Sequence, residues 1–137
     1  MHILFVADPL EVFKTGMKYE RAFAKAGGIL GSGVDPTGNG GALFGYGNQR
    51  NLELLVEAGF TPVEAIQVGS SNGAKALGIF EETGSVTVGK VADLVLVTGN
   101  PAVRIADIKN VELVFRAGLG FDPVKMVAAV RGQVGAR

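Results

Sequence analysis

The sequence predicts an α/β fold up to about residue 80 and a mainly β fold after it. Residues 11–26 place apolar side chains at mostly helical spacing, and Gly27-Gly28 ends that helix. Ile29 and Leu30 follow as a short buried strand, which gives the order of helix, tight turn and strand found in folds built from βα repeats. After Gly84, alternating and β-rich runs replace the helical pattern.

Two further helices are expected between residues 48 and 78. The first covers residues 48–58 and has Leu52 and Leu55 on one face. The second begins at Thr61-Pro62-Val63-Glu64, which supplies a capping residue, a proline at the first helical position and a glutamate at the third. It runs on to Gly78, although Gly69 and Gly73 lower its intrinsic helix propensity.

The remaining residues predict strands and one last helix. Val86 and Val88 alternate with polar residues, and residues 92–97 form a β-rich run. A loop leads to another strand over residues 111–115. Asp122-Pro123 then opens a short amphipathic helix.

Composition and charge exclude several classes of function. Thirteen basic residues balance thirteen acidic ones in the 137-residue chain, so no basic stripe is available for nucleic acid or an anionic membrane. No cysteine is present, which removes thiolate metal sites and cysteine nucleophiles. His2 is the single histidine, so neither a His-centred triad nor a His-rich metal site can come from this chain alone. No apolar run approaches the roughly 20 residues of a membrane span, and we expect a soluble cytoplasmic protein.

Two glycine-rich motifs lack the residues or the spacing that nucleotide binding requires. Gly84-x-x-x-x-Gly89-Lys90 matches the front of a phosphate-binding loop, but Val91 replaces the Ser or Thr that would hold Mg²⁺, and a hairpin turn fits better. The five glycines of residues 37–47 lack the G-x-G-x-x-G spacing of a dinucleotide loop.

Asp35 is the candidate site residue. It comes just after the short buried strand and before Pro36 and the glycine-rich loop, where catalytic residues of βα barrels lie. A carboxylate there could bind a divalent metal or take a proton from a metal-bound water. The alternative is that Asp35 only caps the turn at Pro36.

Four segments carry a resemblance to a known family. They are AFAKAGGILGSGVD (residues 22–35), LELLVEAGFTPVEAIQVGSSNGAKAL (52–77), GSVTVGKVADLVLV (84–97) and VELVFRAG (111–118). In this order and spacing they resemble the C-terminal portion of the metal-dependent amidohydrolases, closest to the imidazolonepropionase-like and prolidase-like branch. The resemblance covers about residues 12–134.

The resemblance implies the end of a TIM-type (β/α)8 barrel followed by strands of a small β-sandwich. Residues 1–80 would be the last helices and strand of the barrel, residues 81–122 the sandwich strands, and residues 123–137 a C-terminal helix and tail. The barrel would be incomplete, because such barrels need roughly 250 residues.

The resemblance also implies a chemistry, which is hydrolysis of a C–N bond in an amide, dipeptide or cyclic amide or amidine. A metal-activated water would attack, with Asp35 as general base and metal contact, and the metal would be divalent, most simply Zn²⁺. Residues 37–46 would line the substrate pocket, with Asn39 and Tyr46 as polar contacts. The family's further ligands, a His-x-His pair, a Lys or Glu and two more histidines, cannot lie in a chain with one histidine. The chain alone should therefore be catalytically silent.

Three interpretations of the short length remain open at this point. The chain is a fragment of a longer amidohydrolase, one subunit of a split enzyme, or a non-catalytic scaffold or binding module. The expected partners are a small-molecule or dipeptide substrate and either further copies of the chain or a complementary N-terminal chain. Neither nucleic acid nor a membrane is expected. An exposed barrel edge would favour such pairing.

Overall fold

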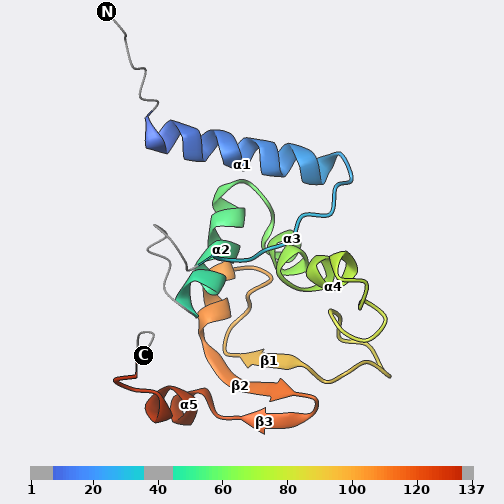
Figure 1. Cartoon of the computed structure of the whole chain (residues 1–137), viewed down its shortest axis with the longest axis vertical. Helices are drawn as coiled ribbons and strands as arrows, with labels where there is room; N and C mark the ends of the chain where they lie inside the picture. The colour runs from blue at the N-terminus through green and yellow to red at the C-terminus, as the bar shows by residue number, and fades with distance from the viewer. Residues whose placement is uncertain (1–7, 36–44, 134–137) are drawn as a thin grey trace, which may run out of the picture.

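The computed structural model describes residues 8–35 and 45–133. Figure 1 shows three parts stacked along the long axis of the molecule. Helix α1 (Pro9–Lys25) lies across one end, the helices α2 (Tyr46–Glu57), α3 (Pro62–Gln67) and α4 (Gly73–Ala76) form the middle, and a small sheet with α5 (Pro123–Ala129) forms the other end.

Helix α1 confirms the helix expected at residues 11–26. Asp8 caps it, because its Oδ1 accepts a hydrogen bond from the Leu10 N–H at 3.0 Å, and Pro9 occupies the first helical position. The chain leaves the helix through Gly27, whose φ of 90° suits glycine. No residue of α1 is buried. Its side chains therefore add little to the core of the described part of the chain.

The strand expected at Ile29 and Leu30 does not form. Residues 28–35 have no regular hydrogen-bonded structure, although the side chains alternate between half-buried and exposed as in a strand. A parallel strand exists only when neighbouring strands accept and donate its backbone hydrogen bonds. No described segment pairs with residues 28–35 in a sheet, so the segment stays extended without becoming a strand.

The middle of the molecule follows the expected helices closely. Helix α2 corresponds to the helix expected at residues 48–58. At the start of α3, the Thr61 hydroxyl accepts from the Glu64 N–H at 3.2 Å and the Glu64 carboxylate accepts from the Thr61 N–H at 2.7 Å, which is a complete capping box. After α3 the chain widens into a π-helical turn, η1 (Val68–Asn72), before α4.

The buried core lies where these helices meet the later part of the chain. Its members are Leu55, Phe60, Ala65, Val68 and Ile105. The first four come from α2 to η1. Ile105 comes from η2 (Ile105–Lys109), a 3₁₀-helix that the sequence did not predict. Burial of this cluster joins the helical part to the sheet part.

The strands of the described residues form one antiparallel sheet in the order β1 (Leu94–Val97), β2 (Val111–Arg116), β3 (Leu119–Phe121). Leu94 pairs with Phe115 at one end of the β1–β2 ladder. The first two strands were expected, and β3 was not. Helix α5 confirms the last expected helix and contacts β2.

The strand expected around Val86 and Val88 is absent. Both side chains are almost fully exposed, and the surrounding backbone forms turns without a ladder partner. Their alternation with polar residues therefore does not reflect burial of one face. Lys90, from the rejected phosphate-loop motif, donates a hydrogen bond to the Phe80 carbonyl, and its Nζ lies 3.7 Å from the centre of the Phe80 ring. Its role is structural.

The incomplete fold expected from the sequence is confirmed only in its broad class. Helices α1 to α4 precede the sheet, and every strand in residues 8–35 and 45–133 follows residue 93. One sheet is present in that part of the chain, so the second sheet of a sandwich and the barrel itself stay predictions. No helix among the described residues has the length and hydropathy that crossing a bilayer requires.

Candidate active site

The candidate site residue, Asp35, lies at the end of the segment of residues 28–35. The segment begins at Gly28, where the ring of Phe23 folds back so closely that a Cβ would lie 2.4 Å from the Phe23 Cζ. A side chain at position 28 would therefore have to displace the exposed Phe23 ring. Beyond it the half-buried positions of the segment, which face the helices, are Leu30, Ser32 and Val34.

Two asparagines hold the segment against the helices. Asn51, on α2, donates from Nδ2 to the Ser32 hydroxyl at 3.1 Å and to the Gly33 carbonyl at 2.9 Å. Asn72, the last residue of η1, donates from Nδ2 to the Leu30 carbonyl at 3.0 Å. Side-chain amides thus satisfy backbone acceptors that a neighbouring strand would satisfy in a sheet.

Asp35 lies at the exposed end of this segment. The preceding residue, Val34, packs against Gly47, because a Cβ on Gly47 would lie 3.2 Å from the Val34 Cγ1. This contact brings the end of the segment beside the start of α2. The chain enters α2 through Gly45, at a φ of 82°, and Tyr46 is the first helical residue.

Of the two residues predicted to contact substrate, the structure describes Tyr46 but not Asn39. Asn39 lies outside the described residues. Tyr46 belongs to the first turn of α2 rather than to the preceding loop, because the left-handed Gly45 ends the loop one residue earlier. Its side chain is exposed. Whether either residue contacts a substrate stays a prediction.

Tyr46 borders an open cavity of about 670 Å³ between the start of α2, strand β2 and helix α5. Apolar side chains of β2 and α5 line most of it, and Lys109 and Arg131 add positive charge. Asp35 is not among the described lining residues. The pocket expected along residues 37–46 stays a prediction, because residues 36–44 lie outside the described part of the chain.

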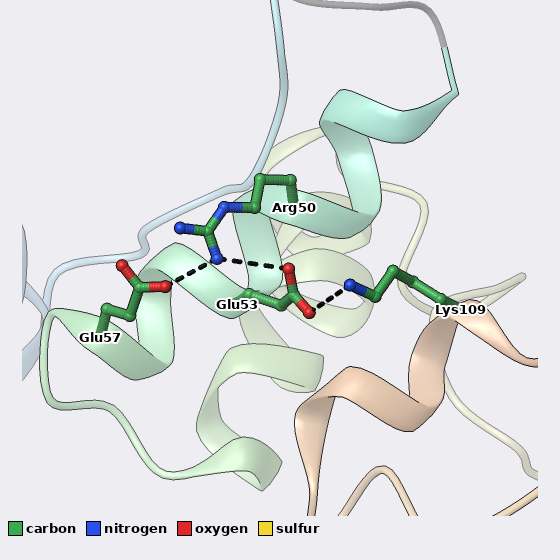
Figure 2. Close-up of polar contacts among 4 residues, drawn as sticks. All are labelled: Arg50, Glu53, Glu57 and Lys109. Atoms are coloured by element: carbon green, nitrogen blue, oxygen red, sulfur yellow. Dashed lines mark hydrogen bonds and ion pairs between the residues drawn. The ribbon is translucent and has the colours of Figure 1, made fainter.

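Charged side chains fix α2 to η2, as Figure 2 shows. Glu53 accepts from Lys109 Nζ at 2.6 Å and from Arg50 at 3.3 Å, and Arg50 also lies 2.6 Å from Glu57. The Lys109 ammonium, and then the Arg50 guanidinium, hold the pKa of Glu53 below its usual value. The hydrogen bonds that Arg50 donates to both glutamates, first of all the one to Glu57, raise the pKa of Arg50. The network links two elements, and its member Lys109 also lines the cavity described above.

The described residues contain no group of three or more His, Cys, Asp or Glu side chains that could hold a metal ion. Asp35 is the predicted metal ligand that lies within the described residues. One carboxylate does not make a hydrolytic metal site. The residues in the described part of the chain therefore do not by themselves fit the metal that the resemblance implies.

Sequence reasoning missed Asn51 and Asn72. A signal was present, because each lies four residues from a buried apolar residue on the same helical stripe: Asn51 from Leu55 and Asn72 from Val68. A polar amide on an otherwise apolar face needs hydrogen-bond partners. Those partners could not be named without the positions of residues 30–33.

The comparisons with known proteins identify the family. The sequence profile of the amidohydrolase family matches residues 12–119. Because this match spans most of the chain, the chain belongs to the amidohydrolase family. The expected resemblance is confirmed.

Individual relatives agree. The chain is 40% identical over 58 residues to a 5'-deoxyadenosine deaminase of Methanobrevibacter smithii, covering 42% of this chain and 13% of that protein. Among solved structures, a putative prolidase from Bifidobacterium longum has a TM-score of 0.68 at 37% identity, with 74% of this chain and 25% of that chain covered. A Xaa-Pro dipeptidase with bound methionine in its active site has a TM-score of 0.65 at 30% identity, over 80% of this chain and 25% of that chain. The chain thus spans about a quarter of these structures.

Proposed function

We propose that this chain supplies the Asp-bearing C-terminal portion of a metal-dependent amidohydrolase that hydrolyses a C–N bond. The substrate class is an amide, a dipeptide, or a cyclic amide or amidine. Asp35 acts as the general base that accepts a proton from the attacking water. The division at about residues 80 and 122 into barrel end, sheet and C-terminal helix is part of this proposal.

The observation that carries the proposal is the position of Asp35 within the family match. It stands at the end of an extended segment that runs from α1 across the helices to the start of α2. In barrels of βα units, catalytic side chains lie at the carboxyl ends of strands. The side chains of the segment alternate between half-buried and exposed as in a strand, and Asp35 at its end is exposed rather than covered by the core.

In this proposal Asp35 is also one contact of a divalent metal, most simply Zn²⁺, which would supply an activated water when bound. Since the described residues do not form a metal group, the other ligands lie outside them, and no step assigned to this chain passes through the metal. The contribution of this chain is a positioned proton acceptor. Asn39 and Tyr46 remain the proposed polar contacts to substrate.

A chimera tests the proposal. Residues 12–119 would replace the segment that they match in the Bifidobacterium longum putative prolidase, after that protein has been shown to hydrolyse Xaa-Pro dipeptides with added Zn²⁺. The chimera should retain hydrolysis, and Asp35→Asn should reduce kcat by about 10²- to 10⁴-fold, the range for loss of a general base. Glu81→Gln, which changes an exposed carboxylate in a turn, serves as the matched control.

Activity that survives Asp35→Asn would reject the assigned role. A folded chimera without activity would favour a non-catalytic scaffold or binding module, and such a module should also ignore Zn²⁺ in a calorimetric titration.

One observation favours a second arrangement, in which this chain is a subunit that pairs with a complementary chain carrying the rest of the site. Helix α1 has no buried residue and exposes Leu10, Val12, Phe13, Tyr19 and Phe23. Apolar side chains gathered on one element are typical of an interface. Affinity capture followed by identification of a co-purifying chain that carries the family's histidines would support this arrangement, and purification without such a chain would count against it.

A further inference from the structure

We infer that Asn51 and Asn72 are positioning residues for Asp35, which they hold in place by clamping the extended segment that ends there. This inference rests on the proposed role of Asp35. It assigns a task to two side chains from different helical elements, α2 and η1, that meet the same short segment.

The hydrogen bonds are directed at the backbone. Nδ2 of Asn51 donates to the Gly33 carbonyl at 2.9 Å and to the Ser32 hydroxyl at 3.1 Å, so both N–H groups of this amide have an acceptor. Nδ2 of Asn72 donates to the Leu30 carbonyl at 3.0 Å. The segment is thus fixed at two separate points upstream of Asp35. Fixing the backbone there restricts the directions in which the carboxylate can point.

Both asparagines are half-buried and lie four residues from a buried apolar side chain. Asn51 shares a helical stripe with Leu55, and Asn72 shares one with Val68, and these two partners are 5% and 4% exposed. A half-buried amide on such a stripe loses hydration, so it is tolerated only when it is hydrogen-bonded. The bonds that compensate the loss all go to residues 30–33.

The π-helical turn supports the same reading. Asn72 is the last residue of η1, and an isolated π-turn inside a helix changes the direction of the side chains that follow it. Two serine hydroxyls bond to carbonyls four residues back, Ser70 to Ile66 at 2.7 Å and Ser71 to Gln67 at 3.3 Å, a contact that often accompanies a bend in a helix. The turn ends at the residue that reaches Leu30.

The test uses this chain and needs no catalysis. Asn51→Asp and Asn72→Asp keep the shape of each side chain but replace the donor with an oxygen that repels the facing carbonyl. Backbone ¹⁵N relaxation would give order parameters for residues 29–35, together with the carboxyl ¹³C resonance of Asp35. Asn51→Ala is a milder variant to be used if the Asp variants do not fold. Asn48→Asp, an exposed residue one turn earlier on α2, adds the same charge as a control.

In the wild type we expect order parameters of about 0.85 in residues 29–35, falling below about 0.6 in each clamp variant. The Asp35 carboxyl resonance should move toward that of an unstructured aspartate. Helices α2 and α3 should keep their order, and Asn48→Asp should change none of these values.

An unchanged segment, or an equal loss of order throughout the helices, would overturn the inference, because the asparagines would then be irrelevant or merely structural. Failure of the proposed function looks different. Residues 29–35 would loosen as expected in this chain, while Asp35→Asn in the chimera would leave hydrolysis intact.

Discussion

Lys109 Nζ lies 2.6 Å from Glu53 Oε1, and this ion pair joins the 3₁₀-helix η2 to the helix α2 (Figure 2). Glu53 is 13% exposed at its side chain, so water screens the pair less than it screens the neighbouring contact of Arg50 with Glu57. The pair lies beside the cluster in which Ile105 packs against the helices. The ion pair therefore connects α2 to η2, the same two elements that the apolar core joins through Leu55 and Ile105.

Removing the charge of Glu53 should weaken this junction. Glu53→Gln should lower the free energy of unfolding at pH 7 by about 1 kcal/mol, since it removes a charge-assisted hydrogen bond from a partly buried place. Urea unfolding followed by circular dichroism measures the change. Glu57→Gln is the matched control, because Glu57 is 51% exposed and should cost no more than about 0.5 kcal/mol. Equal effects of the two substitutions would contradict the special position of Glu53.

The same carboxylate predicts a dependence of stability on pH. The pKa of Glu53 is lowered from its usual value of 4.5 by Lys109 and Arg50. The native state thus favours the ionised form. This stabilisation is fully present above pH 4.5 and is lost as the pH falls through the lowered pKa of the folded state. Unfolding curves from pH 7 to pH 3 should therefore converge for the wild type and Glu53→Gln at the acid end. A constant difference between them would contradict the prediction.

The turn after β1 depends on a glycine. Gly99 has a φ of 108°, and a Cβ there would lie 2.5 Å from Oδ2 of Asp107, which is 4% exposed and accepts the Asn100 N–H at 2.9 Å. Gly99→Ala combines backbone strain with a clash against a buried carboxylate and should lower the midpoint of thermal unfolding. We expect a destabilisation of about 3 kcal/mol.

Gly89→Ala separates the two causes at Gly99. Gly89 has a φ of 93° with nothing within 4 Å of the added Cβ, so it should show backbone strain alone, about 1 kcal/mol. If Gly89→Ala were as destabilising as Gly99→Ala, the contact with Asp107 would be unimportant.

The sequence was informative wherever structure is determined locally. The capping box at Thr61 and Glu64, the proline starts of α3 and α5, and the glycine end of α1 all lie where their local chemistry predicts. Strands were harder, because a strand depends on distant partners. Ile29 and Leu30 have the composition of a strand but no described neighbour with which to pair, and β3 forms because β2 lies beside it.

In the candidate site, too, the locally determined residue was predictable and the residues with distant partners were not. Asp35 could be selected from its place at the end of the GSGVD run, since that signal is local and belongs to a family motif. The two asparagines that hold the segment could not, because their acceptors lie 18 or 19 residues away for Asn51 and 42 residues away for Asn72. A sequence pattern shows that a helix face is interrupted by an amide, but the partner of that amide follows only from the fold.

The capping box also provides a test of local stability. Thr61→Ala removes the acceptor for the Glu64 N–H and should lower the free energy of unfolding by about 0.5–2 kcal/mol. The backbone N–H and then the hydroxyl of Thr61 hold the pKa of Glu64 below its usual value, so NMR titration of the variant should show that pKa rising. An unchanged titration of Glu64 would show that its carboxylate does not depend on the Thr61 hydroxyl.

The exposed apolar side chains of α1 should cause the chain to self-associate. Leu10 and Phe13 are 55% and 48% exposed and lie one helical turn apart, on a helix that buries no residue. Sedimentation velocity over a range of micromolar concentrations should therefore show the chain forming oligomers or aggregates, because water disfavours apolar side chains gathered on one face. The double variant Leu10→Lys, Phe13→Lys should shift the distribution toward monomer. Val88→Lys, which changes an exposed valine in an isolated turn, should not. A monodisperse wild-type monomer at all concentrations would contradict the prediction and would leave α1 exposed in solution, available to a different polypeptide.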